Sequence, residues 1–327
     1  MKKSLFLFIV FSTCILFGQK KYIINDFSED YYLEINPKIV GEENYQLNLY
    51  KSKTKKLVLS TMAFLTEYDF EKLVSNIVQL PYGEQSIVIF DDFNFDGNKD
   101  LALKNGNYSC YGGPSFIVWL SVKGNFVQNK ELTELAHENC GFFNVDKENK
   151  QLHTMTKSGC CWHKFSHYKF QGGKLILFKS VEESFESIFA VQKITERKNG
   201  KMLTVTKRFL PENTFKDDDI FLSYELENTK QLYLLKNFKN KLHYFFTKND
   251  GEVELDFDGI FFYSKKENSL SFENKGAFYK IYNNRIEVSF KNKITVFKAN
   301  VKTRQGNMSG IYVFFKEKNI ENLEIVD

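Results

Sequence analysis

The sequence contains little proline, arginine or tryptophan. Four prolines and 18 glycines among 327 residues exclude collagen and proline-rich linkers. Only four of the 45 basic residues are arginine, the side chain that makes bidentate contacts with phosphate and guanine. The formal net charge is only +4. Together, these shortages argue against a nucleic-acid-binding protein.

Aromatic residues, in contrast, are abundant: 34 Phe, 17 Tyr and 2 Trp. This content is sufficient for a packed core and excludes wholesale disorder. Phe and Tyr are enriched in strands, so the composition favours a mainly β protein. At about 150 residues per domain, the length predicts two domains.

The first 18 residues have the pattern of a secretory signal peptide. Met1–Lys3 is positively charged, residues 5–17 are almost all apolar, and Gly18 is small. We therefore expect export from a bacterium to the periplasm, the cell surface or the medium, with cleavage near Gly18. No later apolar run is long enough to span a membrane. Acylation of Cys14 is an alternative, although the three large apolar residues that follow it disfavour a lipoprotein.

Four cysteines follow the predicted signal peptide: Cys110, Cys140, Cys160 and Cys161. An even number of cysteines in an exported chain predicts disulfide bonds. Adjacent residues on a strand point to opposite faces, which disfavours a bond between Cys160 and Cys161. We expect each of these two to pair with Cys110 or Cys140, and the sequence leaves both arrangements open.

Short apolar segments separated by Gly, Asn or Asp recur about every 8–12 residues, as in antiparallel β proteins. In the first half of the chain they include 31–35, 45–50, 85–90, 100–103 and 116–120, with one helix expected within 64–80. In the second half they include 232–235, 242–247, 277–282, 286–290 and 311–315. Residues 181–220 are charged and weakly patterned. We therefore predict a β-propeller-like antiparallel domain over 22–185 and a second mainly antiparallel β domain over 215–327.

One segment, residues 92–100, carries a specific chemical pattern, D-x-N-x-D-G-x-x-D. Ca²⁺ takes six to eight oxygen ligands, and a glycine lets the loop turn sharply around the ion. The ligands predicted from this spacing are Asp92, Asn94, Asp96, the backbone carbonyl of Asn98, and Asp100. Leu103 stands where an EF-hand has its bidentate glutamate, so this is not an EF-hand. We predict a structural calcium site between two strands.

The loop and its flanking strands resemble the calcium loops of FG-GAP and VCBS-type β-propeller repeats. A longer pattern continues through roughly residues 80–180, and includes Gly112-Gly113-Pro114-Ser115, the aromatic strand 116–120, Gly124-Asn125-Phe126 and Ser158-Gly159-Cys160-Cys161. This pattern resembles the periplasmic immunity proteins, similar to lysozyme inhibitors, that neutralise peptidoglycan-hydrolase effectors of type IV secretion systems. The resemblance implies a propeller-like fold with a calcium loop. It also implies a peptidoglycan hydrolase as the protein partner, inhibited by occlusion of its cleft. Residues 215–327 are not explained by it.

Weaker side-chain patterns do not change this interpretation. His163 and His167 have the spacing of one half of a zinc site, but the adjacent thiols of Cys160 and Cys161 cannot easily reach one metal. Asp256–Gly259 repeats the start of the calcium pattern without its last carboxylate, and is predicted to be a turn at a strand end.

No nucleophile elbow, phosphate loop or dinucleotide fingerprint is present, so we expect a binding protein without catalytic residues. A cell-surface adhesion or glycan-binding module, and a secreted hydrolase with an unrecognised site, are the alternatives.

Overall fold

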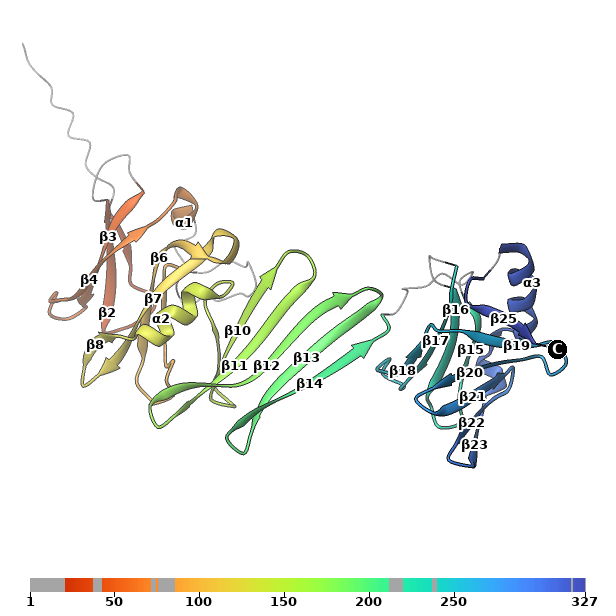
Figure 1. Ribbon diagram of the computed structural model, residues 1–327. Coiled ribbons are helices and arrows are strands. Elements are labelled where there is room, and N and C mark those ends of the chain that lie inside the picture. Colours follow the sequence, from red (N-terminus) through yellow and green to blue (C-terminus); the bar gives the residue numbers. More distant parts are fainter. Residues whose placement is uncertain are drawn as a thin grey trace, which may run out of the picture. The chain divides into compact units, whose positions relative to one another are not determined.

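The computed structural model describes residues 21–37, 43–71, 75, 86–211, 220–236, 240–318 and 320–326 (Figure 1). The predicted signal peptide (1–18) and Cys14 lie outside these ranges. The protein is mainly β, as predicted, and its strands form five sheets. Within the described ranges, no helix has the length and apolarity needed to cross a membrane. The chain divides into two compact units: the described residues up to Lys157 with Phe165–Phe178, and Ser158–Lys164 with the described residues from Lys179 onward.

Two four-stranded antiparallel sheets open the first unit. The first has the order β1 (Tyr22–Ile24), β2 (Tyr31–Pro37), β3 (Asn44–Lys51) and β4 (Leu57–Phe64). The second has the order β5 (Val88–Asp91), β6 (Asp100–Ser109), β7 (Gly113–Val122) and β8 (Asn125–Gln128). In each sheet, consecutive strands pair, as in the blades of propeller folds. In the described residues these are separate antiparallel sheets, and no closed propeller is seen among them.

The second of these sheets is buried on both faces. On one face, Val88, Leu101 and Leu103 pack with Leu33 and Leu47 of the first sheet. On the other face, the neighbouring strand residues pack against helix α2 (Lys130–Glu138) and a pair of phenylalanines; this second cluster includes Ile89, Ala102, Val118, Leu132, Ala136, Phe142 and Phe143. Burial of both faces explains why these strands are continuous apolar runs rather than alternating ones. Helix α1 (Glu67–Glu71) lies within the helix predicted over 64–80; the described residues settle only that part of it.

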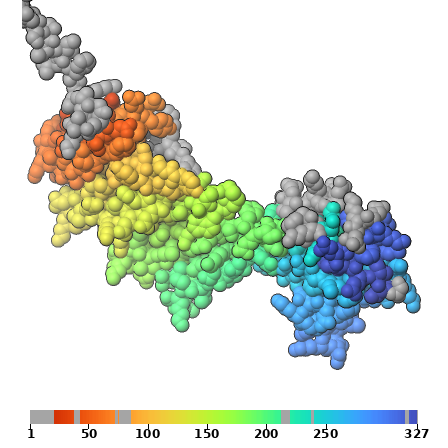
Figure 2. All heavy atoms as spheres, turned by 45° about the horizontal axis from the view of Figure 1, so that its top comes forward, coloured from red at the N-terminus to blue at the C-terminus, as the bar shows by residue number. Residues whose placement is uncertain are grey.

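The third sheet has the order β14-β13-β12-β11-β10-β9. Its strands are β9 (Asn144–Asp146), β10 (Gln151–Ser158), β11 (Trp162–Gln171), β12 (Lys174–Glu186), β13 (Phe189–Lys198) and β14 (Lys201–Phe209). Long strands thus occupy much of 181–220, the charged and weakly patterned part of the sequence. Because β14 has polar residues on both faces, its sequence does not show a clear alternation of apolar and polar residues. The signal that could have revealed the hairpin of β13 and β14 is the dipeptide Asn199-Gly200, both residues of which have positive φ (51° and 78°). This part of the chain is green in Figure 2, where a green segment projects from the surface.

The second unit contains two further sheets and a helix. One sheet has the order β18 (Val253–Phe257), β17 (Leu242–Thr247), β16 (Gln231–Lys236), β15 (Ile220–Glu225) and β24 (Gln305–Gly306). The other has the order β23 (Lys293–Lys298), β22 (Arg285–Phe290), β21 (Ala277–Tyr282), β20 (Ser269–Asn274), β19 (Phe261–Ser264) and β25 (Leu323–Val326). Neighbouring strands in these two sheets are antiparallel except β19 and β25, which are parallel. A turn η3 (Val301–Thr303) and helix α3 (Met308–Lys318) complete the unit.

A common core joins the two sheets of the second unit. The ring of Tyr224 is buried with Leu232, Phe261 and Phe272, and its hydroxyl donates to the carbonyls of Tyr282 and Arg285, both at 3.0 Å. On a separate cluster, Phe189 and Val191 of β13 pack against Leu235, Phe245 and Val253. This packing joins β13 to strands β16, β17 and β18 within the second unit.

The strand predicted over 311–315 is wrong, because these residues lie within helix α3. The apolar residues Met308, Ile311 and Phe315 recur at intervals of three and four, which is the period of a helix. Met308 and Ile311 are fully buried, whereas Val313 is 53% exposed. Five consecutive apolar residues had concealed this period.

Candidate functional site

Four of the five residues predicted to bind calcium lie in the loop between β5 and β6, and the fifth, Asp100, is the first residue of β6. Asp91 and Asp100 are paired across the two strands, so the ends of the loop are held together. Within it, Phe95 and Gly97 have positive φ angles of 61° and 91°. Gly97 adopts this left-handed conformation without the steric cost that a side chain would bring.

The side-chain oxygens of the loop accept hydrogen bonds from its own backbone. Asp92 accepts from the amides of Asp96 (3.1 Å) and Gly97 (2.9 Å). Asn94 also accepts from the Asp96 amide (3.1 Å), and Asp96 accepts from the Asn98 amide (2.8 Å). The carboxylates of Asp92 and Asp96 are therefore directed toward the loop backbone rather than away from it.

Asp100 is the buried member of the group. Its carboxylate is fully buried and accepts from the amides of Phe93 and Ser121, both at 2.8 Å. Burial raises the pKa of Asp100 to about 6, against the effect of these two hydrogen bonds, and the charges of Asp96 and Asp92 act in the same direction as burial. These oxygen donors are of the type that Ca²⁺ prefers. In the described part of the chain, however, no three His, Cys, Asp or Glu side chains converge as metal ligands, so the calcium site stays a prediction.

Phe93 anchors the loop in the core. Its ring is fully buried and makes edge contacts with Phe142 (5.3 Å between centroids) and Phe143 (5.5 Å). The loop thus combines an exposed acidic side with an apolar anchor. A distortion of the backbone around Phe93 would therefore be transmitted to the packing of the second sheet.

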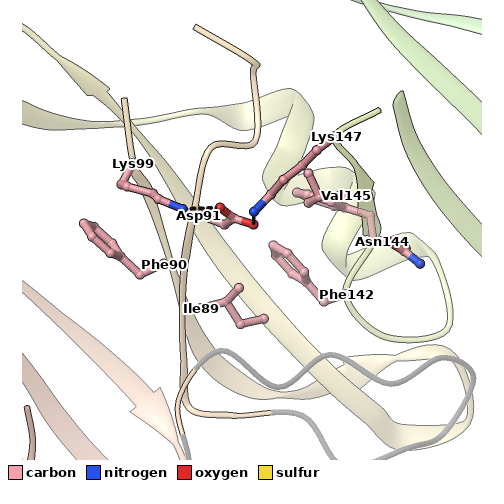
Figure 3. Close-up of a pocket in the computed structure, with 9 residues that line it drawn as sticks. Ile89, Phe90, Asp91, Lys99, Phe142, Asn144, Val145 and Lys147 are labelled. Carbon is pink, nitrogen blue, oxygen red and sulfur yellow. Dashed lines mark hydrogen bonds and ion pairs between the residues drawn. The ribbon is translucent and has the colours of Figure 1, made fainter. Parts of the chain in front are cut away.

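A pocket of about 350 Å³ lies beside this loop (Figure 3). Its lining includes Ile89, Phe90 and Phe142, and the carboxylate of Asp91 receives both Lys99 (2.5 Å) and Lys147 (2.8 Å). Partial burial acts to raise the pKa of Asp91, but the two ammonium groups outweigh it and lower the pKa. The two ion pairs tie the loop to the turn that follows β9.

The opposite end of β6 carries a different structure. There the chain turns through η1 (Cys110–Gly112), and Cys110 is joined by a disulfide to Cys140, at a Cα–Cα distance of 4.8 Å. The Ser109 hydroxyl accepts from the Gly141 amide (3.3 Å), which gives a second link across the same gap. Sequence reasoning did not single out this turn beyond its glycines and cysteine.

Two tyrosines are exposed here: Tyr108, next to the last residue of β6, and Tyr111 in η1. Tyr108 is 63% exposed, and its ring stacks on His137 with centroids 6.4 Å apart. Tyr111 is 64% exposed, and its backbone is left-handed (φ 55°, ψ 30°), which is rare for a tyrosine. Gly106 gives the Tyr108 ring its space, because a Cβ at that position would lie 2.4 Å from the ring. The turn therefore presents two aromatic rings on a backbone with little freedom.

The predicted disulfide pairing is wrong. Cys110 bonds Cys140, and Cys160 bonds its neighbour Cys161. The argument from strand geometry fails because Cys160 and Cys161 lie in the turn between β10 and β11, not on a strand. Gly159, with φ of +63°, helps the chain to turn there.

Two minor sequence patterns are also located by the structure. Asp256 lies on strand β18, one residue from its end, and receives Arg208 at 2.6 Å; the neighbouring His243 and Arg208 lower its pKa to about 2. This agrees with the interpretation of Asp256–Gly259 as a strand end. His163 and His167 lie on strand β11, and the cysteines before them are disulfide-bonded.

No protein-family model matches the chain, and no curated protein does either. Among solved structures, it is similar to a Xanthomonas type IV secretion system related protein, with 19% identity, a TM-score of 0.47, and coverage of 58% of this chain and 95% of that chain. An uncharacterized Listeria monocytogenes protein gives 9% identity, a TM-score of 0.24 and coverage of 83% and 80%. A prolyl endopeptidase structure gives 9% identity and a TM-score of 0.25, with coverage of 86% of this chain and 42% of that chain.

Proposed function

We propose that this protein is an exported, non-catalytic inhibitor that binds a peptidoglycan hydrolase and occludes its cleft. The hydrolase as partner follows from the resemblance of residues 80–180 to immunity proteins of the lysozyme-inhibitor type. The structural observation that carries the proposal is the turn at 106–113, which presents Tyr108 and Tyr111 on a disulfide-linked backbone.

This turn has the properties of an interface anchor. Tyrosine and tryptophan dominate binding energy at protein interfaces, since they bury a large area for few rotatable bonds. A turn that is already rigid loses little conformational entropy on binding. Exposed aromatic rings on such a turn can enter a concave partner surface, such as the cleft that holds a polysaccharide chain.

In this proposal, calcium has a structural role. Asp92, Asn94, Asp96, the Asn98 carbonyl and Asp100 would hold the ion, which would neutralise carboxylates that otherwise repel one another. Asp100 and Gly106 are six residues apart on β6, so at roughly 3.3 Å per residue about 20 Å separates the end of this loop from the start of the tyrosine turn. The ion would therefore stabilise the sheet that carries the turn without contacting the partner.

The test measures hydrolysis of purified peptidoglycan by a panel of lysozyme-type muramidases at increasing concentrations of the full chain. We expect stoichiometric inhibition of at least one enzyme. Tyr108→Ala and Tyr111→Ala should each weaken inhibition about 30-fold, which corresponds to a hot-spot contribution of about 2 kcal/mol. Tyr68→Ala is the matched control, because Tyr68 is equally exposed (65%) but lies on helix α1.

Two outcomes would contradict the proposal. If no muramidase is inhibited, and the protein instead sediments with enzyme-free cell wall, a glycan-binding module becomes the better interpretation. If inhibition occurs but all three tyrosine variants retain it, the contact surface lies elsewhere on the molecule.

A further inference from the structure

The disulfide between Cys160 and Cys161 lies at an exposed position in the second unit. Both cysteines are exposed in the turn that connects β10 to β11. They line a pocket of about 310 Å³ together with His163, Phe185 and Phe209. Phe185 is 60% exposed, so the pocket is open to solvent along an apolar side.

This bond does little to stabilise the fold. The entropy that a disulfide removes from the unfolded chain grows with the length of the loop it closes, and here the two residues are adjacent. The bond between Cys110 and Cys140 is the opposite case: it spans 30 residues, and Cys140 is 2% exposed. The chain therefore contains one disulfide of structural type and one whose presence needs another explanation.

The exposure of the bond between Cys160 and Cys161 explains why this disulfide is present. Exchange requires a thiolate to approach a disulfide sulfur, so exposed disulfides are the ones that react. The apolar lining beside Cys160 and Cys161, formed by Phe185, Val191 and Phe209, can receive the aliphatic part of a dithiol. The imidazole of His163 lines the same pocket and can give a proton to a departing cysteine thiolate.

We infer that Cys160 and Cys161 form a reversible thiol–disulfide exchange site whose substrate is an external dithiol. One thiolate of the dithiol attacks one cysteine sulfur, which breaks the bond between the cysteines and forms a mixed disulfide. The released cysteine thiolate takes a proton. The second thiol of the dithiol loses its proton and attacks the mixed disulfide, and the second cysteine leaves and is protonated. Two electrons and two protons pass to the protein, and the dithiol becomes a disulfide.

This inference does not depend on the proposed function, and a mass measurement tests it. The native full chain is equilibrated with increasing dithiothreitol, alkylated, unfolded and digested with trypsin. Cys160 and Cys161 fall in one peptide, residues 158–164, separate from the peptides of Cys110 and Cys140. We expect half-alkylation of peptide 158–164 at a dithiothreitol concentration at least ten-fold lower than for Cys110 and Cys140. Dialysis into oxidised dithiothreitol should restore the bond.

A second measurement uses Trp162, which is next to Cys161. Adjacent disulfides quench indole fluorescence, so reduction should raise the emission of Trp162 with the same dithiothreitol dependence; Trp119→Phe removes the background of the other tryptophan. The variant Cys160→Ser/Cys161→Ser should lose this response. His163→Ala should slow the exchange several-fold and leave its end point unchanged.

The inference is overturned if the two disulfides are reduced over the same concentration range, or if Cys110 and Cys140 are alkylated first. It is also overturned if peptide 158–164 is fully alkylated before any reductant is added, since the cysteines would then be free thiols.

Discussion

The two ends of strand β6 differ in which side chains they bury and which they expose. At its start, the loop 92–100 directs its polar oxygens to its own backbone and places Phe93 in the core. At its end, the turn 106–113 is linked to Cys140 by the disulfide of Cys110, and Tyr108 and Tyr111 are exposed. At the first end, the polar side chains are hydrogen-bonded within the loop, as in a structural site. At the second end, two aromatic side chains are exposed, as in a contact site. Mutations at the two ends should therefore separate stability from binding.

The largest effect is expected at the anchor of the loop. Phe93→Ala removes a fully buried ring that makes edge contacts with Phe142 and Phe143, and should lower the free energy of unfolding by about 3–5 kcal/mol. Urea denaturation measures this change. Tyr111→Ala, at the other end, should change it by less than about 0.5 kcal/mol. Similar losses for both variants would remove the distinction between the two ends.

The next largest effect is expected from the disulfide behind the tyrosine turn. Cys110→Ser/Cys140→Ser opens a loop of 30 residues and should cost about 3–4 kcal/mol of stability. It should also weaken inhibition, because the turn must then be ordered on binding. Cys160→Ser/Cys161→Ser is the matched control and should leave the urea midpoint nearly unchanged. If Cys160→Ser/Cys161→Ser loses as much stability as Cys110→Ser/Cys140→Ser, the length of the closed loop does not determine how much each disulfide stabilises the protein.

Removal of calcium should have an intermediate effect. With calcium at a hundred-fold excess over its dissociation constant, chelation should lower the free energy of unfolding by about 2.7 kcal/mol. Asp96→Asn should reduce this calcium response, whereas Asp258→Asn, in the truncated copy of the pattern, should retain it. Calorimetry with and without chelator measures both. If the wild-type protein unfolds identically in chelator, the loop does not need an ion.

The smallest effect should have the opposite sign. Tyr111 is held in a left-handed conformation that costs a non-glycine residue about 1–2 kcal/mol. Tyr111→Gly should therefore stabilise the protein by about 0.5–1 kcal/mol, after the greater freedom of glycine in the unfolded chain is included. Inhibition should nevertheless weaken as in Tyr111→Ala. If Tyr111→Gly is instead less stable than the wild type, the packing of the Tyr111 ring stabilises the fold.

Local patterns predicted much of the first unit. The apolar runs around Val88, Leu101 and Val118 are strands because their composition and bounding turns favour no other element. The oxygen spacing of residues 92–100 placed the acidic loop between two of them. The same reasoning failed where tertiary packing decides. The polar strands β13 and β14 are stabilised by neighbours rather than by an apolar alternation, and helix α3 was hidden within a continuous apolar run.

By itself, the sequence determined the β class and the acidic loop, because both depend on residue type and short-range spacing. Only the tertiary structure decided which cysteines pair, because that depends on turns that bring Cys110 to Cys140 and Cys160 to Cys161. It also decided which aromatic rings are core and which are surface. Phe93 is fully buried in the cluster beside helix α2, whereas Tyr111 is 64% exposed.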